Sequence, residues 1–501
     1  MYKYNEPGPH KRQVPEYDCK ISSDKIKDIF SCCGDFVSRK INIGLCDGAE
    51  LFLCWIDGLV AGADVAENII RPLTQQSRCH RAQTMQQYCQ LIMQGGVYSY
   101  SVVLRREMDE LVSDLGRGCC ALVFDELNCA LCFEARSGFV RAVSEPTLEK
   151  SLKGAKDSFV ETLRINTALV RRRICSPKLK LVESTIGRKS HTRVALMYID
   201  GVASPEIVEE LASRLDAIDV DSLTALGTIE EYIVDAPRSP FPQVLHTERP
   251  DRFATYLFEG RVGLIVDGIP IGLVVPVSLS EFLKVTSDNS MHHIVASSLA
   301  FLRYLAVLLC VFLPALYVAV AMYHQEMIPT RLLLSIIEAK QDVPFSTAVE
   351  VLSMIVALSM LQEAGLRLPN PIGNTISIIG VLIVGQSAVE ARVVSPIAII
   401  VVAVSGISSY TIPSQDLAFT LRICRFLLLL AAVAAGLFGV GVVCVLILMH
   451  IAAIDNFGIN YTSPLSSAGP GGLIRLFYRP FKPNDKFRDP ALNTPDKRRQ
   501  R

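Results

Sequence analysis

The chain has 501 residues, about half of them apolar, and its 50 Lys and Arg balance 50 Asp and Glu. This length allows several domains, and a net charge of zero gives no reason to expect nucleic acid as a partner. Nearly all charges lie before Gln325 or after Asp455, and the stretch between is rich in Val, Ile, Leu and Ala. We therefore expect a soluble region followed by a membrane domain.

The N-terminal 28 residues carry prolines and charges with little periodicity, which predicts a flexible tail over 1–28. Met1–Lys40 lacks the apolar run of a secretory signal, so we expect the N-terminal region to be cytosolic. The fifteen cysteines are then expected to be reduced. Cys129 and Cys132 form a C-x-x-C, but no second pair stands at zinc spacing, so we predict structural thiols and no metal or other cofactor.

The soluble region contains an internal repeat. LFLCWIDG, beginning at Leu51, resembles VALMYIDG, beginning at Val194. Each copy is an apolar run of strand length that ends in Ile-Asp-Gly and leads into a helical pattern. After the second copy, Ser204 and Pro205 are typical of a helix N-cap and first helical position. The repeat predicts two structural units of similar design.

Each half also carries a hairpin pattern. In the first half the turn is expected near residues 126–128, and in the second Asp267-Gly268 favours a tight turn. We therefore predict two tandem α/β subdomains, 29–182 and 183–292.

Asp57, Asp200 and Asp267 each precede a glycine. Aspartate and glycine commonly end strands and make turns, whereas the alternative role is acid–base catalysis. The sequence lacks the glycine-rich phosphate loops, nucleophile elbow and H-E-x-x-H motif of common enzymes. We predict that the chain is not an enzyme; a catalytic role would require Asp57 and Asp200 to share a pocket.

An all-α membrane domain is predicted over 293–455. Three uncharged segments are long enough to cross a hydrocarbon core of about 30 Å; they are Tyr304–Tyr323, Val393–Ser409 and Phe426–Met449. The C-terminal tail, 456–501, is basic and by the positive-inside rule cytosolic. With both ends of the chain on one side the number of crossings is even, and we expect about four.

Two shorter apolar segments, Val351–Leu361 and Thr375–Val389, are harder to assign. The second follows the breaker-rich sequence LPNPIGN. Short stretches of this kind are typical of re-entrant or interfacial helices. We expect this part of the chain to cross the bilayer once or to lie partly in its interface.

Few carboxylates lie near these segments, where an ionised side chain is costly. Glu350, Glu363 and Glu390 are candidate pore or gating residues, together with Gln386 one turn before Glu390. The alternative is that they lie at helix ends in the headgroup zone.

Small residues recur at four-residue spacing in the segment Phe426–Met449. Such residues let helices approach closely. The candidate helix-packing residues are Ala432, Ala435, Gly436 and Gly439.

Several long blocks of sequence resemble one family. They are SPFPQVLHTERPDR (239–252), YHQEMIPTRLLLSI (323–336), EAGLRLPNPIGNTISIIG (363–380), GQSAVEARVVSP (385–396) and FGINYTSPLS (457–466). With DFVSRKINIG and WIDGLV nearer the N-terminus, the resemblance runs from Asp35 to about Ser467. The chain resembles the A subunit of GerA-type nutrient germinant receptors, which lie in the inner membrane of bacterial endospores.

The resemblance implies a non-enzymatic membrane subunit. It implies two partners, a transporter-like B subunit that holds the nutrient and a C-subunit lipoprotein. It also implies self-association into a ring, a pentamer, that forms an ion channel in the lipid bilayer and opens when nutrient binds. The alternatives are a non-conducting scaffold for the B subunit and a specialised A-like protein associated with the dipicolinate channel.

The chain departs from the family in the helix that precedes EAGLRLP. Family sequences typically carry acidic residues there and a basic residue just before Glu363, whereas this chain has Ile355, Ser359 and Gln362. If those positions line the ion path, this protein has a less charged path and different conductance, selectivity or gating.

Overall fold

The computed structural model describes residue 17 and residues 19–42, 50–75, 84–97, 101–136, 149, 154–367, 385–465 and 476–500. These residues form two compact units. Unit 1 comprises the chain up to Ile233 with His246–Val275 and Leu492–Arg499. Unit 2 comprises Val234–Leu245 and Pro276–Ala491, with the last two residues of the chain.

Unit 1 contains two five-stranded sheets with the same topology, ordered β1-β2-β4-β5-β3 and β6-β7-β9-β10-β8. The first sheet has β1 (Phe36–Asn42), β2 (Glu50–Ile56), β3 (Val102–Arg105), β4 (Cys119–Phe124) and β5 (Cys129–Glu134). The second has β6 (Leu179–Ile186), β7 (Thr192–Ile199), β8 (Leu245–Thr247), β9 (Val262–Val266) and β10 (Gly272–Val275). The two Ile-Asp-Gly copies are β2 and β7, the second strand of each sheet, so the predicted repeat of α/β design is confirmed.

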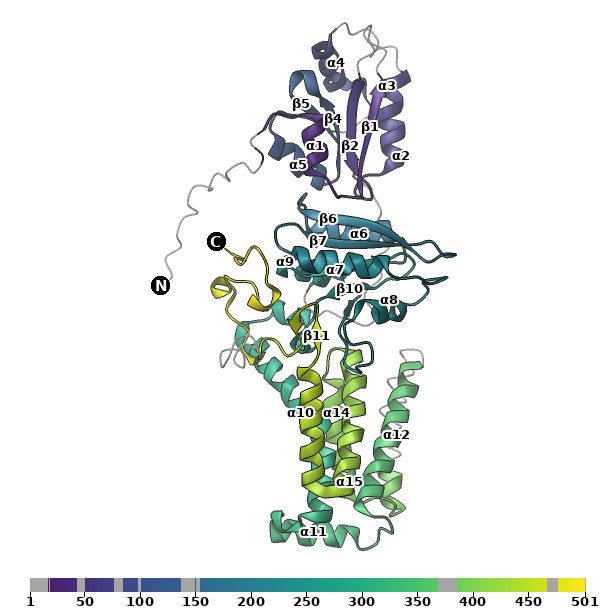
Figure 1. The fold of residues 1–501 in the computed structure, drawn as a ribbon, viewed down its shortest axis with the longest axis vertical. Helices are drawn as coiled ribbons and strands as arrows, with labels where there is room; N and C mark the ends of the chain where they lie inside the picture. The colour runs from purple at the N-terminus through teal and green to yellow at the C-terminus, as the bar shows by residue number, and fades with distance from the viewer. Residues whose placement is uncertain are drawn as a thin grey trace. The chain divides into compact units, whose positions relative to one another are not determined.

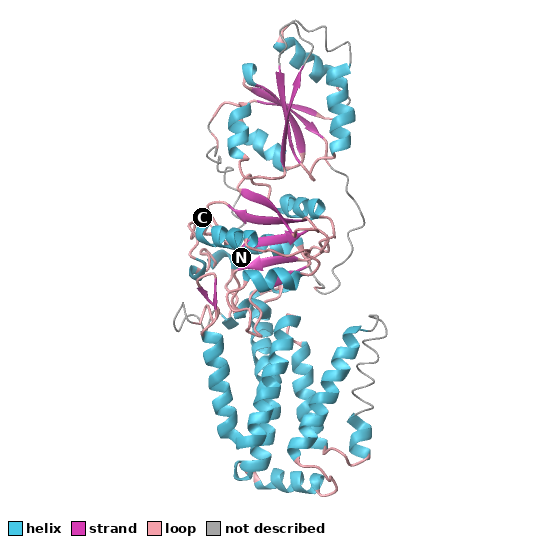
Figure 2. Cartoon of the chain, turned by 45° about the vertical axis from the view of Figure 1, so that its right-hand side comes forward, coloured by secondary structure: helices cyan, strands magenta, loops and turns pink. Residues whose placement is uncertain are grey.

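Helices flank each sheet (Figure 2). Around the first sheet lie α1 (Ser23–Ile29), α2 (Gly62–Asp64), α3 (Arg71–Gln75), α4 (Met85–Leu91) and α5 (Met108–Gly116). Around the second lie α6 (Leu163–Arg173), α7 (Pro205–Asp216), α8 (Leu226–Ile233) and α9 (Pro250–Glu259). Alternate residues of β2 enter two cores, Leu53 with α3 and α4, and Cys54 with α1 and α5. A strand buried on both faces reads as a continuous apolar run.

The predicted turns form as expected. Asn128 takes a left-handed conformation between β4 and β5 (φ 48°), and Gly268 does so between β9 and β10 (φ 87°). Pro205 begins α7, with Ser204 at its N-cap. The sequence predicts these positions correctly because each depends on one residue type. A tight turn needs a residue that tolerates positive φ, and a proline with its fixed φ suits the first position of a helix.

The division between the subdomains differs from the predicted boundary at 182/183. Strand β6 runs through this point, and α6 packs against β7, β9 and α9, so the second subdomain begins before α6. Pro177 and Gly187, two breaker residues, lie on either side of this point. They flank β6, and Gly187 has φ 95°, so these breaker residues delimit a strand.

Unit 2 is mostly helical. Its helices are α10 (His293–Tyr323), α11 (Thr330–Lys340), α12 (Thr347–Arg367), α14 (Pro396–Tyr410) and α15 (Gln415–Ala452), and the described residues 385–390 are also helical. Among the described residues, three helices are long and apolar enough to cross a membrane, namely His293–Tyr323, Thr347–Gly365 and Gln415–Ala452. The predicted segment Val351–Leu361 is the middle of α12. Most of Thr375–Val389 lies outside the described residues.

Helix α15 folds back on itself at Ala435-Gly436. Both residues have non-helical backbone angles, and Gly436 has φ 59°. We call residues 415–434 the first arm and residues 437–452 the second arm. The uncharged run Phe426–Met449 predicts one crossing, but the turn divides this segment between the two arms.

Contacts at its two ends show that α15 is not straight. A straight helix of 38 residues would be about 57 Å long. Yet Thr420 in the first arm donates to the Pro240 carbonyl (2.5 Å), and His450 in the second arm is hydrogen-bonded to Ser239 (2.8 Å). The two arms therefore lie side by side (Figure 1).

A loop at 234–245, which we call the docked loop, is fixed to unit 2 by further contacts. The side-chain amide of Asn456 donates to the carbonyls of Gln243 (2.7 Å) and Val277 (2.9 Å). The Tyr461 hydroxyl donates to the carbonyl of Pro242 (2.7 Å). Asn456 belongs to β11 (Asp455–Asn456), which pairs with β12 (Ile459–Asn460) directly after α15.

Candidate functional site

Glu350 lies inside unit 2, where its side chain is fully buried. One carboxylate oxygen accepts the backbone N–H of Ser395 (2.9 Å) at the N-terminus of α14. The other lies 3.4 Å from Nζ of Lys340, which also donates to Thr347. A helix N-terminus and an ammonium group both attract negative charge, so Glu350 has two favourable partners inside the unit. In this chain Glu350 holds α11, α12 and α14 together.

Glu390 and Gln386 are exposed on the helical residues 385–390. The Gln386 amide donates to the Glu390 carboxylate (2.9 Å). Two residues further on, Arg392 forms an exposed ion pair with Asp342 (2.9 Å). Glu363 is also exposed, near the end of α12. The structure therefore places Glu390 and Gln386 together, and it does not bring Glu350 to them.

The predicted helix-packing residues surround the turn of α15. Ala432 is fully buried, and Ala435 and Gly436 form the turn itself. A Cβ atom on Gly436 would lie 3.0 Å from Tyr323, and one on Gly439 would collide with the carbonyl of Ala431. The small residues thus let the second arm pass close to the first arm and to α10.

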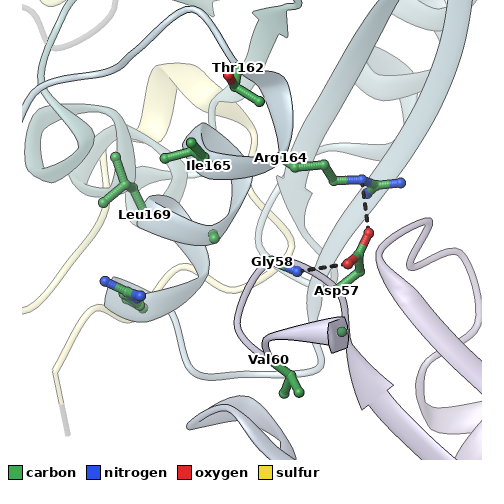
Figure 3. Close-up of a pocket in the computed structure, with 10 residues that line it drawn as sticks. Asp57, Gly58, Val60, Thr162, Arg164, Ile165 and Leu169 are labelled. Atoms are coloured by element: carbon green, nitrogen blue, oxygen red, sulfur yellow. Dashed lines mark hydrogen bonds and ion pairs between the residues drawn. The ribbon is translucent and has the colours of Figure 1, made fainter. Parts of the chain in front are cut away.

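Unit 1 has a cavity of about 250 Å³ between the segment that follows β2 and helix α6 (Figure 3). Asp57 at its edge accepts the N–H of Gly58 (3.1 Å) and lies 3.3 Å from Nε of Arg164. Arg164 also pairs with Glu183 (2.6 Å). The remaining wall is largely apolar, and the cavity is slightly smaller than usual ligand pockets of about 300–1,000 Å³. It has room for a small molecule.

The other two Asp-Gly carboxylates do not join Asp57. Asp267 accepts the N–H of Leu163 (2.9 Å) and so caps α6, and Asp200 is not among the residues that line the cavity. Asp57 and Asp200 therefore do not share this pocket, which was the condition for a catalytic role. Among the described residues, no group of three or more His, Cys, Asp and Glu could hold a metal ion.

The chain matches the family model described as Bacillus/Clostridium GerA spore germination protein over residues 24–489. The chain belongs to the GerA family. The match covers most of both units, so each is a part of the family's architecture.

Individual relatives agree with this family. Spore germination protein B1 of Bacillus subtilis is 37% identical, over 84% of this chain and 86% of its own. Spore germination protein KA of the same species is 35% identical, over 93% and 85%, and the uncharacterized membrane protein YfkQ is 35% identical, over 89% and 86%. This chain is therefore a member of the A-subunit family of spore germinant receptors, and both the relatives and the apolar helices support a membrane location.

A solved structure is also similar. It is the N-terminal domain of the A subunit of the Bacillus megaterium spore germinant receptor GerK3, at 31% identity and a TM-score of 0.39. The similarity covers 50% of this chain and 92% of that domain.

Three positions that the sequence analysis singled out, Ile355, Ser359 and Gln362, lie on α12. Ile355 is buried, and its carbonyl accepts the hydroxyl of Ser359 (2.7 Å). Gln362 donates to Ser409 of α14 (3.1 Å), while its own side-chain oxygen is buried without a partner. In this chain Ile355 and Gln362 are therefore buried in unit 2, and Gln362 is hydrogen-bonded to α14.

Sequence reasoning missed Arg425. This arginine lies in the first arm and is 1% exposed. The predicted crossing begins at Phe426, immediately after it, because an uncharged window cannot contain an arginine. The available signal was a positive charge within an apolar run, which is uncommon in membrane helices and typical of functional positions.

Proposed function

We propose that the chain is the A subunit of a spore germinant receptor and that copies of it assemble into a nutrient-gated ion channel. The proposed partners are a transporter-like B subunit that holds the nutrient and a C-subunit lipoprotein, and the proposed assembly is a pentamer in the inner membrane of the spore. Family membership supports the receptor role. Channel opening would release ions and start germination.

The observation that carries the channel proposal is the exposed pair of Gln386 and Glu390 on a unit built of apolar helices. Lipid cannot solvate a carboxylate, so such a group faces water or another chain. Arg392 and Asp342, also exposed, extend this polar surface. A ring of copies would bring these side chains together around a water-filled mouth.

The arrangement of unit 2 supports an even number of crossings. Tyr323, the last residue of α10, donates its hydroxyl to the carbonyl of Val433 (2.6 Å), just before the turn of α15. From that turn the second arm returns toward the end where α10 begins. The N- and C-terminal regions would then lie on the same side, which we propose is cytosolic.

The substitution Glu390→Gln tests the channel proposal. It removes one negative charge per subunit from the proposed mouth and keeps the side-chain size. We expect slower ion release and slower germination in spores that carry the variant receptor. The matched control is Glu326→Gln, an exposed carboxylate in the turn between α10 and α11, which should leave both rates unchanged. Unchanged ion release and germination in Glu390→Gln would remove this residue from the path.

One observation favours the scaffold alternative. Glu350, a candidate for lining a path, is engaged within its own chain by Lys340 and Ser395. A subunit that only positions a conducting B subunit would need no carboxylate along a water-filled path, and a Glu350 held in this way fits that role. The mass of the purified complex separates the two: a ring of A subunits supports the channel, and one A subunit per B subunit supports the scaffold. The specialised A-like protein would instead copurify with the dipicolinate channel.

A further inference from the structure

Arg425 is a buried arginine with almost no compensation. Its side chain is 1% exposed, and one terminal nitrogen donates a hydrogen bond of 3.2 Å to the hydroxyl of Ser405 on α14. Its Nε is buried and has no acceptor. A guanidinium has five N–H donors and stays charged in proteins. Most of its capacity is therefore unused.

The position of Ser405 follows from a proline in α10. Pro314 has no N–H, so the carbonyl four residues earlier, that of Cys310, lacks its helical partner. The Ser405 hydroxyl donates to this carbonyl (2.8 Å). Its proton is thus committed to α10, and only its oxygen lone pairs remain for Arg425. One neutral hydroxyl holds three helices together around the charge.

Unit 2 supplies no carboxylate for Arg425. Among the described residues, none forms an ion pair with it, and Glu350 is already engaged by Lys340. The parts of unit 2 that the structure does not describe, 368–384 and 466–475, contain no Asp or Glu. A buried charge without a counter-charge strongly destabilises the state that buries it. The closed packing of α10, α14 and the first arm therefore carries this penalty.

We propose that Arg425 drives receptor activation, because separation of the first arm from α14 hydrates its guanidinium. The charge raises the free energy of the resting state, and water lowers that of the activated state. Ser405 opposes this effect as the one group that stabilises the buried charge. The proposal rests on the assignment of the chain as a receptor subunit, and it holds whether this chain or its B subunit conducts the ions.

Two substitutions with opposite expected signs test this inference. Arg425→Met keeps the length of the side chain and removes the charge. It should raise the melting temperature of the purified full-length protein in detergent and raise the nutrient concentration for half-maximal germination about tenfold, as expected when a buried charge is replaced by an apolar group. Ser405→Ala should lower both quantities. Arg425→Gln keeps hydrogen-bond donors but no charge, and should shift both quantities as Arg425→Met does.

The matched control is Arg422→Met. Arg422 lies on the same arm one turn earlier, is half-buried, and stacks on Phe419 (5.2 Å). It should change the nutrient concentration by less than about twofold, because a half-exposed guanidinium is already hydrated. A merely structural role for Arg425 would instead lower the melting temperature in Arg425→Met.

The possible results are distinguishable. A lower melting temperature in both Arg425→Met and Arg425→Gln overturns the inference, as does a higher one with an unchanged nutrient response. If Glu390→Gln leaves ion release unchanged while Arg425→Met raises the nutrient requirement, the proposed path is wrong and the role of Arg425 stands.

Discussion

At the scale of single residues, the structure holds two fully paired buried charges that contrast with Arg425. Arg171 of α6 donates two hydrogen bonds to the carboxylate of Asp35 (2.7 and 2.9 Å), and both side chains are 1% exposed. It also donates to the carbonyls of Ser176 and Leu179. Burial opposes the charge of Arg171, but Asp35 outweighs it, and the pKa of Arg171 is raised. The pair joins the two subdomains of unit 1.

The substitution Arg171→Met should strongly destabilise unit 1. It leaves Asp35 buried without a counter-charge, so we expect the free energy of unfolding to fall by about 3–5 kcal/mol. The single tryptophan, Trp55 in β2, reports the unfolding of the first sheet in urea. The control is Arg188→Met, which removes an exposed ion pair with Asp219 and should have little effect. If Arg171→Met and the wild type unfolded at the same urea concentration, the ion pair would not stabilise unit 1.

Buried thiols make the first sheet sensitive to alkali. Burial raises the pKa of Cys54 and of Cys132 above the ordinary value of 9.0, and that of Cys89 to about 11. A thiol whose pKa is raised in the folded state contributes stability below its unfolded pKa, and this contribution is lost as pH rises. We therefore expect the melting temperature of unit 1 to fall above about pH 9.

The measurement is the melting temperature between pH 7 and pH 10.5, followed by Trp55 fluorescence. Cys54→Ala should reduce the slope, because it removes one buried group that must ionise. A constant melting temperature up to pH 10.5 would show that these thiols do not ionise on unfolding. Exposed Cys32 and Cys175 should react with iodoacetamide at pH 8 well before Cys54 does.

At the scale of elements, the turn in α15 depends on Gly436. A turn leaves the last carbonyls of the preceding helix without helical partners, and the Tyr323 hydroxyl satisfies that of Val433. Gly436 lies against the same tyrosine with positive φ. Any other residue there meets both a backbone penalty and a close contact.

The substitution Gly436→Ala should lower the stability of unit 2 by about 1–3 kcal/mol, the usual penalty of a strained backbone position. The melting temperature of the purified protein in detergent measures this. Gly441→Ala is the matched control, because Gly441 lies in the second arm with no atom within 4 Å of an added Cβ. There alanine should be neutral or stabilising. Equal effects of the two substitutions would argue against a tight turn at Gly436.

The sequence predicted elements well where a local pattern determined them. β2, β7, α7 and both hairpins follow from apolar runs bounded by turn residues. The turn of α15 was not predicted, because Ala435-Gly436 in an apolar run reads equally well as a helix-packing motif. Only its contacts with Tyr323 and the docked loop distinguish the two. The environment of Glu350 was likewise unpredictable, since Lys340 reaches it through tertiary contact of α11 with α12.

At the scale of the whole molecule, the two units share a chain that passes between them several times. The docked loop leaves unit 1 after Ile233 and returns at His246, and within unit 2 it contacts both arms of α15 and β11. Because the docked loop is bonded to both arms and continues directly into unit 1, a movement of the arms can pull on the chain segments of unit 1. Asn456, one of its anchors, is fully buried.

The substitution Asn456→Ala should weaken this transmission. It leaves two buried carbonyls without their donor, at about 1–3 kcal/mol each. We expect a lower melting temperature in detergent and a weaker germination response at equal protein level. The matched control is Asn460→Ala in β12, whose side chain is exposed. A normal germination response in Asn456→Ala, with protein present, would exclude this loop from signalling.

The folded-back form of α15 also constrains how the protein is made. The second arm is about 24 Å long, shorter than a hydrocarbon core of about 30 Å, while the first arm carries two arginines that resist entry into lipid. By itself, therefore, neither arm is expected to insert efficiently into the bilayer as a membrane-spanning helix. During synthesis the two should enter the bilayer as a preformed pair, with the uncharged second arm assisting the first. A ribosome that stalls before residue 437 would therefore leave Arg425 outside the bilayer.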